Sequence, residues 1–224
     1  MGRARPGGTG PRPLTDAGRA LGAVAPLPRL MLVTDRRATE GRDLVDVVEA
    51  AVAGGVGLVQ LRERDLPESE IADLLRRLLA RLEGSPARLL LNSHPDIARA
   101  LAVGLHLPAA APRPVEPPAL YGRAVHDEAE ARRALAEKVS YAVVGPVFPT
   151  GSKPGHPGAG VDLLARLVTA IAPTPVYAIG GLTPERVGSI YGAGAHGVAV
   201  RSAILSARDP KGAARAFADA LSAG

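Results

Sequence analysis

The sequence predicts an α/β fold, specifically a (β/α)8 TIM barrel with a parallel eight-stranded core. Eight short apolar runs recur along the 224 residues, and most are followed by a stretch with helical periodicity. This length suits one barrel and is too short for a barrel plus a second full domain. Most of the runs end in a polar residue or a glycine, and barrel active sites lie at the carboxyl ends of the strands. These endings are Thr34-Asp35, Gln60-Leu61-Arg62, Asn92, His106, His126, Gly145, Gly180-Gly181 and Arg201-Ser202.

The apolar runs predict strands at 29–33, 58–61, 88–91, 104–107, 121–125, 142–144, 176–179 and 197–200. Helical periodicity predicts helices at 43–53, 67–82, 95–102, 128–137, 162–172, 184–193 and 210–221. The segment 108–118 holds five prolines among its eleven residues, so we expect no regular helix there. The long Gly/Pro-rich loop at 146–160 is a candidate lid over a ligand.

Two parts of the chain differ in composition. We expect residues 1–27 to form a disordered, basic, Gly/Pro-rich tail and residues 28–224 to form a single barrel domain. The tail has no apolar stretch of the kind that secretory signals carry, which favours a cytoplasmic protein. Much of the net charge of +5 lies in the tail, where four arginines accompany one aspartate. The smaller excess on the barrel favours a small anionic substrate.

Composition excludes several classes of function. The chain has no cysteine, which excludes disulfides, thiolate catalysis and cysteine-bound metals. Only 3% of the residues are aromatic, so few side chains could stack on bases, and we expect no nucleic-acid partner. No apolar run approaches the length of a membrane span, so we expect no membrane association. No histidine pair and carboxylate have metal-ligand spacing, so we expect no bound metal.

Two neighbouring loops predict a phosphate site. In TIM barrels the loops after strands 7 and 8 commonly bind phosphate through backbone N–H groups and the start of a short helix. Here these loops carry Gly180-Gly181 and Ser202-Ala203. The alternative is that the glycines simply make a tight turn, but the presence of both loops favours phosphate. We expect a bulky side chain at position 181 to project into the anion pocket.

Further polar groups follow other strands. Gln60, Arg62 and Arg64 alternate along an extended segment, so their side chains share one side, and arginine recognises carboxylate or phosphate in a bidentate manner. For Arg64 a surface ion-pair cluster is an equal alternative. Asn92 ends strand 3, and Lys153 belongs to the predicted lid, which also offers two hydroxyl groups to an anion.

Two histidines end neighbouring strands. His126 follows strand 5, where an imidazole could shuttle a proton near neutral pH. Taken alone, a capping or core role would be the better interpretation of this residue. His106 ends strand 4, and for it we favour a structural role.

Four segments resemble the thiamine-phosphate synthase superfamily, and the resemblance runs from about Leu27 to the C-terminus. They are Val59-Gln-Leu-Arg-Glu-Arg64, Gly145-Pro-Val-Phe-Pro-Thr-Gly-Ser-Lys153, Tyr177-Ala-Ile-Gly-Gly-Leu-Thr-Pro184 and Gly197-Val-Ala-Val-Arg-Ser-Ala-Ile204. Synthases of this superfamily join hydroxymethylpyrimidine pyrophosphate to thiazole phosphate, with Mg²⁺ on the pyrophosphate. Their pattern has Asn-Asp after strand 3 and an aspartate shortly after strand 4. This chain has Ser93 and Ala111 at those two places, and neither supplies the carboxylate that Mg²⁺ favours.

Other residues resemble the TenI-like thiazole tautomerase branch of the same superfamily. They are Leu105-His-Leu-Pro108, Gly122-Arg-Ala-Val-His126 and Arg62-Glu-Arg64, whereas the lid keeps the synthase-like Pro-Thr-x-Ser-Lys pattern. In that branch the histidine after strand 5 moves the proton that aromatises a carboxythiazole phosphate. The resemblance therefore implies that His126 is the catalytic residue.

The sequence thus predicts a metal-independent isomerase of thiamine biosynthesis. Gly181, Ser202 and Ala203 would anchor the phosphate, and Gln60 and Arg62 would hold the other polar end of the substrate. The expected partners are a small phosphorylated thiazole and, in a homo-oligomer, further copies of the chain. One alternative is a true thiamine-phosphate synthase, which would need Mg²⁺. A second is a non-catalytic barrel that binds a phosphorylated ligand and regulates a partner.

Overall fold

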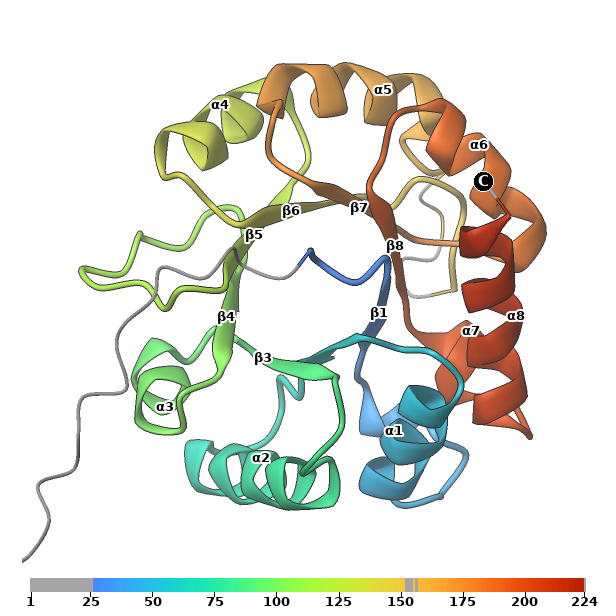
Figure 1. Ribbon diagram of the computed structural model, residues 1–224. Helices are drawn as coiled ribbons and strands as arrows, with labels where there is room; N and C mark the ends of the chain where they lie inside the picture. The colour runs from blue at the N-terminus through green and yellow to red at the C-terminus, as the bar shows by residue number, and fades with distance from the viewer. Residues whose placement is uncertain (1–25, 152–154, 156, 224) are drawn as a thin grey trace, which may run out of the picture.

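Eight parallel strands close into a barrel in the computed structural model, which describes residues 26–151, 155 and 157–223. The strands pair in chain order, and β1 pairs with β8 to close the ring (Figure 1). This arrangement confirms the predicted TIM barrel. The strands are β1 (Leu30–Val33), β2 (Leu58–Leu61), β3 (Arg88–Asn92), β4 (Gly104–Leu107), β5 (Tyr121–Val125), β6 (Tyr141–Val144), β7 (Val176–Ile179) and β8 (Gly197–Val200).

Helices cover the outside of the ring (Figure 1). They are α1 (Leu44–Ala53), α2 (Glu68–Arg81), α3 (Pro95–Ala100), α4 (Glu128–Ala136), α5 (Gly160–Ile171), α6 (Val187–Gly192), α7 (Ser202–Leu205) and α8 (Pro210–Ser222), with short 3-10 turns η1 (Arg36–Ala38) and η2 (Pro184–Arg186). Aspartate caps fix several helix starts: the side chains of Asp43, Asp127 and Asp209 each accept a hydrogen bond from a backbone N–H of the first turn.

Alternation along the strands separates two hydrophobic cores. On β1, Leu30 and Leu32 face the helices, whereas Met31 and Val33 point into the barrel. The barrel interior also holds Tyr141 and Tyr177, whose rings meet edge to face with centroids 5.6 Å apart. The few aromatic residues of this chain are therefore used partly to fill the barrel.

The expected absence of a helix between β4 and β5 is confirmed. Arg123 on β5, whose side chain is fully buried, holds the first part of this connection in place. Its guanidinium donates hydrogen bonds to the carbonyls of Pro108, Ala109 and Ala111 at 3.1, 3.0 and 2.7 Å, and it pairs with Glu137 at 2.8 Å. A buried charge needs such partners, and here it fixes a proline-rich segment that has no regular structure of its own.

Some elements differ from the prediction. The expected helix at 184–193 divides into η2 and α6, and neither the four-residue helix α7 nor the 3-10 turn η1 was predicted. The predicted disordered tail falls almost entirely on residues 1–25, outside the described residues. Leu27, at the start of the described chain, packs on the interior core, and its carbonyl accepts a hydrogen bond from His196 at 2.8 Å if Nε2 carries the proton.

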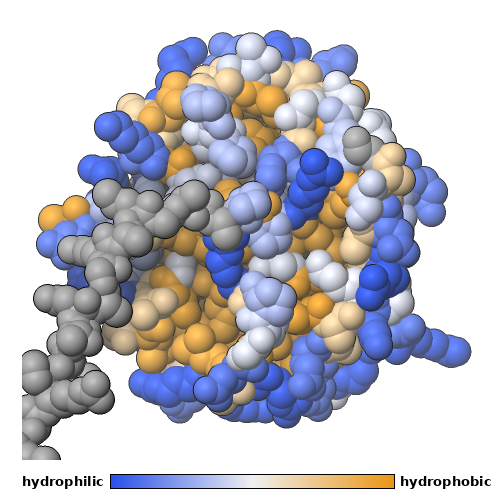
Figure 2. Space-filling model, viewed as in Figure 1, coloured by the Kyte–Doolittle hydropathy of each residue, from blue (hydrophilic) through white to orange (hydrophobic). Residues whose placement is uncertain are grey.

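Hydrophilic residues dominate the outer edge of the face in Figure 2, and hydrophobic residues lie closer to the barrel axis. In the described part of the chain, no helix is both long and apolar enough to span a bilayer.

Candidate active site

A cavity of about 670 Å³ opens at the carboxyl end of the barrel. Residues from or just after all eight strands line it, because a closed parallel barrel brings every strand end to one mouth. The strands contribute, in order, Val33 and Asp35, Gln60 and Arg62, Asn92, His106, Ala124 and His126, Val143 and Gly145, Ile179 and Gly180, and Ala199 and Arg201.

The structure brings nine of the ten predicted site residues to this one cavity. Those nine are Gln60, Arg62, Arg64, Asn92, His126, Gly180, Gly181, Ser202 and Ala203. The tenth, Lys153, lies outside the described residues. The structure shows that these residues share one cavity, and their roles in binding and catalysis are predictions.

The two predicted phosphate loops lie beside each other at the mouth. Gly180 and Gly181 have φ angles of +104° and +62°, a region that glycine enters without steric cost. A Cβ atom at Gly181 would lie 2.4 Å from the carbonyl oxygen of Pro149 and 2.8 Å from Cβ of Phe148. A side chain at position 181 would therefore meet the first part of the 146–160 loop rather than the open cavity. This corrects the expectation from sequence.

Backbone contacts join the phosphate loop to the base of the predicted lid. The N–H of Phe148 donates to the carbonyl of Gly180 at 3.1 Å. Arg186 donates to the carbonyl of Gly181, and its guanidinium lies 4.5 Å from the centroid of the Phe148 ring. These contacts hold the Gly180-Gly181 loop against the first residues of the 146–160 loop.

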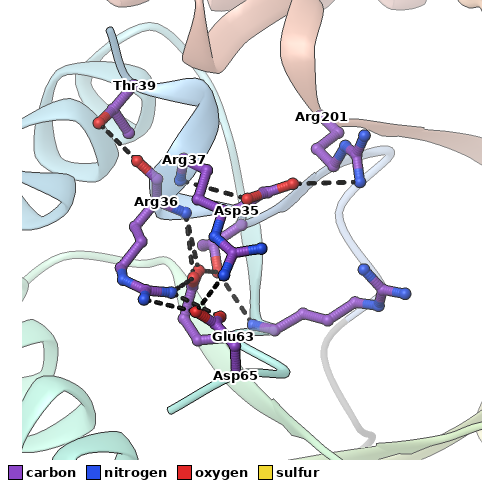
Figure 3. Close-up of polar contacts among 9 residues, drawn as sticks. Asp35, Arg36, Arg37, Thr39, Glu63, Asp65 and Arg201 are labelled. Carbon is purple, nitrogen blue, oxygen red and sulfur yellow. Dashed lines mark hydrogen bonds and ion pairs between the residues drawn. The ribbon is translucent and has the colours of Figure 1, made fainter. Parts of the chain in front are cut away.

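A buried carboxylate organises the ends of β1 and β2 (Figure 3). The Glu63 side chain accepts hydrogen bonds from the hydroxyl of Thr34 at 2.7 Å and from the backbone N–H of Arg36 at 3.0 Å. The same hydroxyl accepts from the backbone N–H of Arg62 at 2.9 Å. Because each group is satisfied by its neighbour, this network fixes the backbone from which Arg62 extends.

More arginines than acids surround this network. Arg36 forms a bidentate pair with Asp65 at 2.6 Å, which holds the pKa of that carboxyl well below its usual range, and Arg201 lies 3.3 Å from Asp35 (Figure 3). Burial lowers the pKa of Arg62, and the positive charges of Arg64 and Arg201 lower it further by smaller amounts. The Arg62 guanidinium donates no hydrogen bond to another described residue. Its surroundings suit an anionic ligand group.

His106 lies on the cavity wall and is buried at the same time. Its Nδ1 atom is 3.2 Å from the Tyr141 hydroxyl, and the two rings stack with centroids 5.7 Å apart. Burial, with smaller contributions from the charges of Arg62 and Arg123, lowers the pKa of His106 to about 3. The imidazole is thus neutral at physiological pH. Sequence reasoning gave this residue a structural role, and the structure adds a place on the cavity wall.

His126 lies at the rim of the cavity, directly after β5, and 47% of its side chain is exposed. Its Nδ1 atom lies 2.9 Å from Oε2 of Glu130, and the backbone N–H of His126 donates to the same oxygen at 2.7 Å. Glu130 itself does not line the cavity. The hydrogen bond of the imidazole involves Nδ1, and Nε2 has no hydrogen-bond partner among the described residues.

The residues at the two places where the synthase pattern has carboxylates, Ser93 and Ala111, offer no carboxylate oxygen to Mg²⁺. The Ser93 hydroxyl accepts a hydrogen bond from the Asn92 amide at 2.7 Å, and the carbonyl of Ala111 accepts from Arg123. The carboxylates that do line the cavity, those of Asp35, Glu63 and Asp65, are each paired with an arginine. No group of three or more His, Cys, Asp or Glu residues able to hold a metal occurs among the described residues.

Several functional neighbours were missed from sequence. Asp35 and Arg37 line the cavity although neither was proposed as a site residue. Asp35 belongs to the Thr34-Asp35 ending of the first expected strand, which was a usable signal. Glu130 could have been noticed from the Asp127-x-x-Glu130 spacing, which is typical of a helix capping box. Its contact with His126 could not have been read from that spacing.

The fold and the cavity define an enzyme-like (β/α)8 barrel whose mouth is rich in arginine and glycine. The family model described as thiamine monophosphate synthase matches residues 30–204. This chain belongs to that family, and its activity is accordingly one of thiamine biosynthesis.

Relatives support this assignment. A protein of Geobacter sulfurreducens that is provisionally named a thiamine-phosphate synthase is 42% identical over 197 residues, which cover 84% of this chain and 92% of the relative. The thiamine-phosphate synthase of Mycolicibacterium gilvum is 38% identical over 209 residues, which cover 86% of this chain and 87% of the relative. None of these names distinguishes the tautomerase branch.

Solved structures agree on the fold. Thiamine phosphate pyrophosphorylase from Pyrococcus furiosus superposes with a TM-score of 0.77 at 26% identity, covering 87% of this chain and 96% of that one. A 3-hexulose-6-phosphate synthase superposes with a TM-score of 0.62 at 16% identity, covering 86% of this chain and 99% of that one. The second likeness concerns the barrel alone.

Proposed function

We propose that this protein is a thiazole tautomerase, a metal-independent isomerase that aromatises a carboxythiazole phosphate. The observation that carries this proposal is the combination of a proton-transfer group, His126, with a cavity whose acids are all paired with arginines. Such a site can hold an anionic heterocycle and move a proton, but it offers poor ligands to the Mg²⁺ that a pyrophosphate-using reaction needs.

In this proposal the two ends of the substrate bind to different groups at the mouth. The backbone N–H groups of Gly181, Ser202 and Ala203 bind the phosphate, with Gly180 allowing its close approach. Gln60 and Arg62 hold the carboxylate, since arginine pairs with carboxylate in a bidentate manner. Arg64 and Asn92, which also line the cavity, complete the polar surroundings of the ligand.

The reaction then needs one acid–base group. His126 removes a proton from one ring position of the thiazole and returns it at another, so that no atom or electron is gained or lost. The aromatic product supplies the driving force. Positioning of the substrate and proton transfer by the imidazole are sufficient for the rate enhancement.

Thiamine-phosphate synthesis is the second candidate function, and the names of the relatives favour it. The lid sequence Pro149-Thr-Gly-Ser-Lys153 also resembles that of synthases. This candidate requires that Mg²⁺ be bound without the two carboxylates that the synthase pattern has at the positions of Ser93 and Ala111.

One assay on the purified full-length protein separates the candidates. It follows tautomerisation of carboxythiazole phosphate and formation of thiamine phosphate in parallel, each with Mg²⁺ and with EDTA. We expect tautomerisation that persists in EDTA and no thiamine phosphate. Strictly Mg²⁺-dependent formation of thiamine phosphate would establish the synthase instead. Binding of the thiazole phosphate without turnover in either assay would favour the regulatory barrel.

A further inference from the structure

One carboxylate oxygen holds two groups of His126. Oε2 of Glu130 lies 2.7 Å from the backbone nitrogen and 2.9 Å from the ring Nδ1 of this histidine. Glu130 is partly shielded, with 22% of its side chain exposed, and its own backbone N–H donates to the Asp127 side chain at 2.8 Å. Glu130 is therefore held by hydrogen bonds of both its main chain and its side chain.

This contact decides which ring nitrogen carries the proton. An ionised carboxylate can only accept hydrogen bonds, whereas a neutral imidazole has one donor and one acceptor nitrogen. Nδ1 faces the carboxylate at hydrogen-bonding distance and must therefore be the donor. Nε2, on the opposite edge of the ring, then has the free lone pair that a general base needs.

We propose that Glu130 is a positioning residue that holds His126 as its Nδ1–H tautomer and aims Nε2 into the cavity. The part of this inference that concerns turnover rests on the proposed function. The tautomer itself does not, because it follows from the contact alone. Glu130 also stabilises the imidazolium that forms when His126 accepts a proton from the substrate.

A purely structural role is the alternative to be tested. Asp127 and Glu130 have the spacing of a capping box, in which the acid at the third helical position supports the start of the helix. Glu130 differs from the standard motif because it accepts from the backbone of His126, one residue before the N-cap Asp127. Both glutamate and glutamine occur at this position of capping boxes, so Glu130→Gln preserves the structural role.

The first measurement reads the tautomer directly. Long-range ¹H–¹⁵N spectra of protein labelled at histidine distinguish Nδ1–H from Nε2–H rings, and His126→Asn assigns the signal. We expect the Nδ1–H form in the wild type and in Glu130→Gln, and a mixture of tautomers in Glu130→Ala. An Nε2–H ring in the wild type would overturn the proposal, whether or not the protein is a tautomerase.

The second measurement concerns turnover by the full-length enzyme. We expect Glu130→Ala to lower kcat roughly 10- to 100-fold, a part of the 10²–10⁴-fold that a positioned acid–base group supplies. The Kd of the thiazole phosphate should stay the same, because Glu130 does not line the cavity. Glu130→Gln should recover part of the lost kcat.

The matched control is Glu128→Ala in the same helical turn. Glu128 is exposed, and its carboxylate lies 3.6 Å from Arg132 with no contact to His126. This variant should keep wild-type kcat and the wild-type tautomer. If Glu130→Ala kept full kcat while His126→Asn was inactive, the positioning role would be refuted and the proposed function would stand. If the wild type showed no tautomerase activity, the spectra would still decide the tautomer.

Discussion

Replacing Gly181 with alanine tests the phosphate site at the point where the backbone is most constrained. The new Cβ would lie 2.4 Å from the carbonyl oxygen of Pro149, about 1 Å closer than ordinary van der Waals contact. The φ angle of +62° is also unfavourable for alanine. The loop must therefore move by about 1 Å, away from the base of the lid.

This displacement weakens the binding of phosphate. A shift of this size takes the Gly181 N–H out of hydrogen-bonding distance of a bound phosphate. A hydrogen bond to a charged group contributes about 1.5–3 kcal/mol, so the affinity should fall roughly 10- to 100-fold. The left-handed conformation costs alanine a further 1–2 kcal/mol or so, which lowers the Tm of a barrel of this size by about 2–8 °C.

Calorimetric titration with thiazole phosphate measures the affinity, and thermal unfolding measures the Tm. The control is Gly188→Ala in α6, where a Cβ meets no atom within 4 Å and an alanine favours the helix. This control should bind normally and melt at or slightly above the wild-type temperature. If Gly181→Ala also bound normally, the phosphate would not lie on this loop.

Two further predictions concern the histidines. His126→Asn should keep ligand affinity while turnover falls roughly 10²–10⁴-fold, and near-normal turnover together with an inactive His106→Asn would show that the wrong histidine was chosen. His106 has a pKa lowered to about 3 by burial, so the unfolded chain takes up a proton there first as pH falls from about 6.5 towards 3. The free energy of unfolding should therefore decrease over this range by up to about 1.4 kcal/mol per pH unit. His106→Gln should flatten the dependence in denaturant titrations, and an unchanged slope would contradict the neutral buried ring.

The fold could be predicted from the sequence because its determinants are local and repeated. Short apolar runs alternate with helical periodicity, and five of the eight strands begin and end where the pattern indicates. Elements without such a pattern were missed: α7 is one turn long, and η1 is shorter still. A segment of three or four residues holds too little periodicity to be recognised.

Much of the candidate site could also be predicted from the sequence, for a topological reason. In a closed parallel barrel the residues at and just after the end of every strand lie at the same mouth. Gln60, Asn92, His126 and Gly180 therefore converge although they are far apart in the chain. The positions of the strand ends were therefore sufficient to predict that these residues share one site, although no contact between them was known.

Only the tertiary structure decided how these groups are oriented. The Cβ position of Gly181 faces Pro149 rather than the cavity. Glu130 contacts Nδ1 of His126, and Arg123 is buried against three carbonyls. The sequence determined which residues reach the mouth, because that depends on strand order alone. Which atoms face one another depends on backbone angles and packing between segments distant in sequence, and no local pattern encodes these.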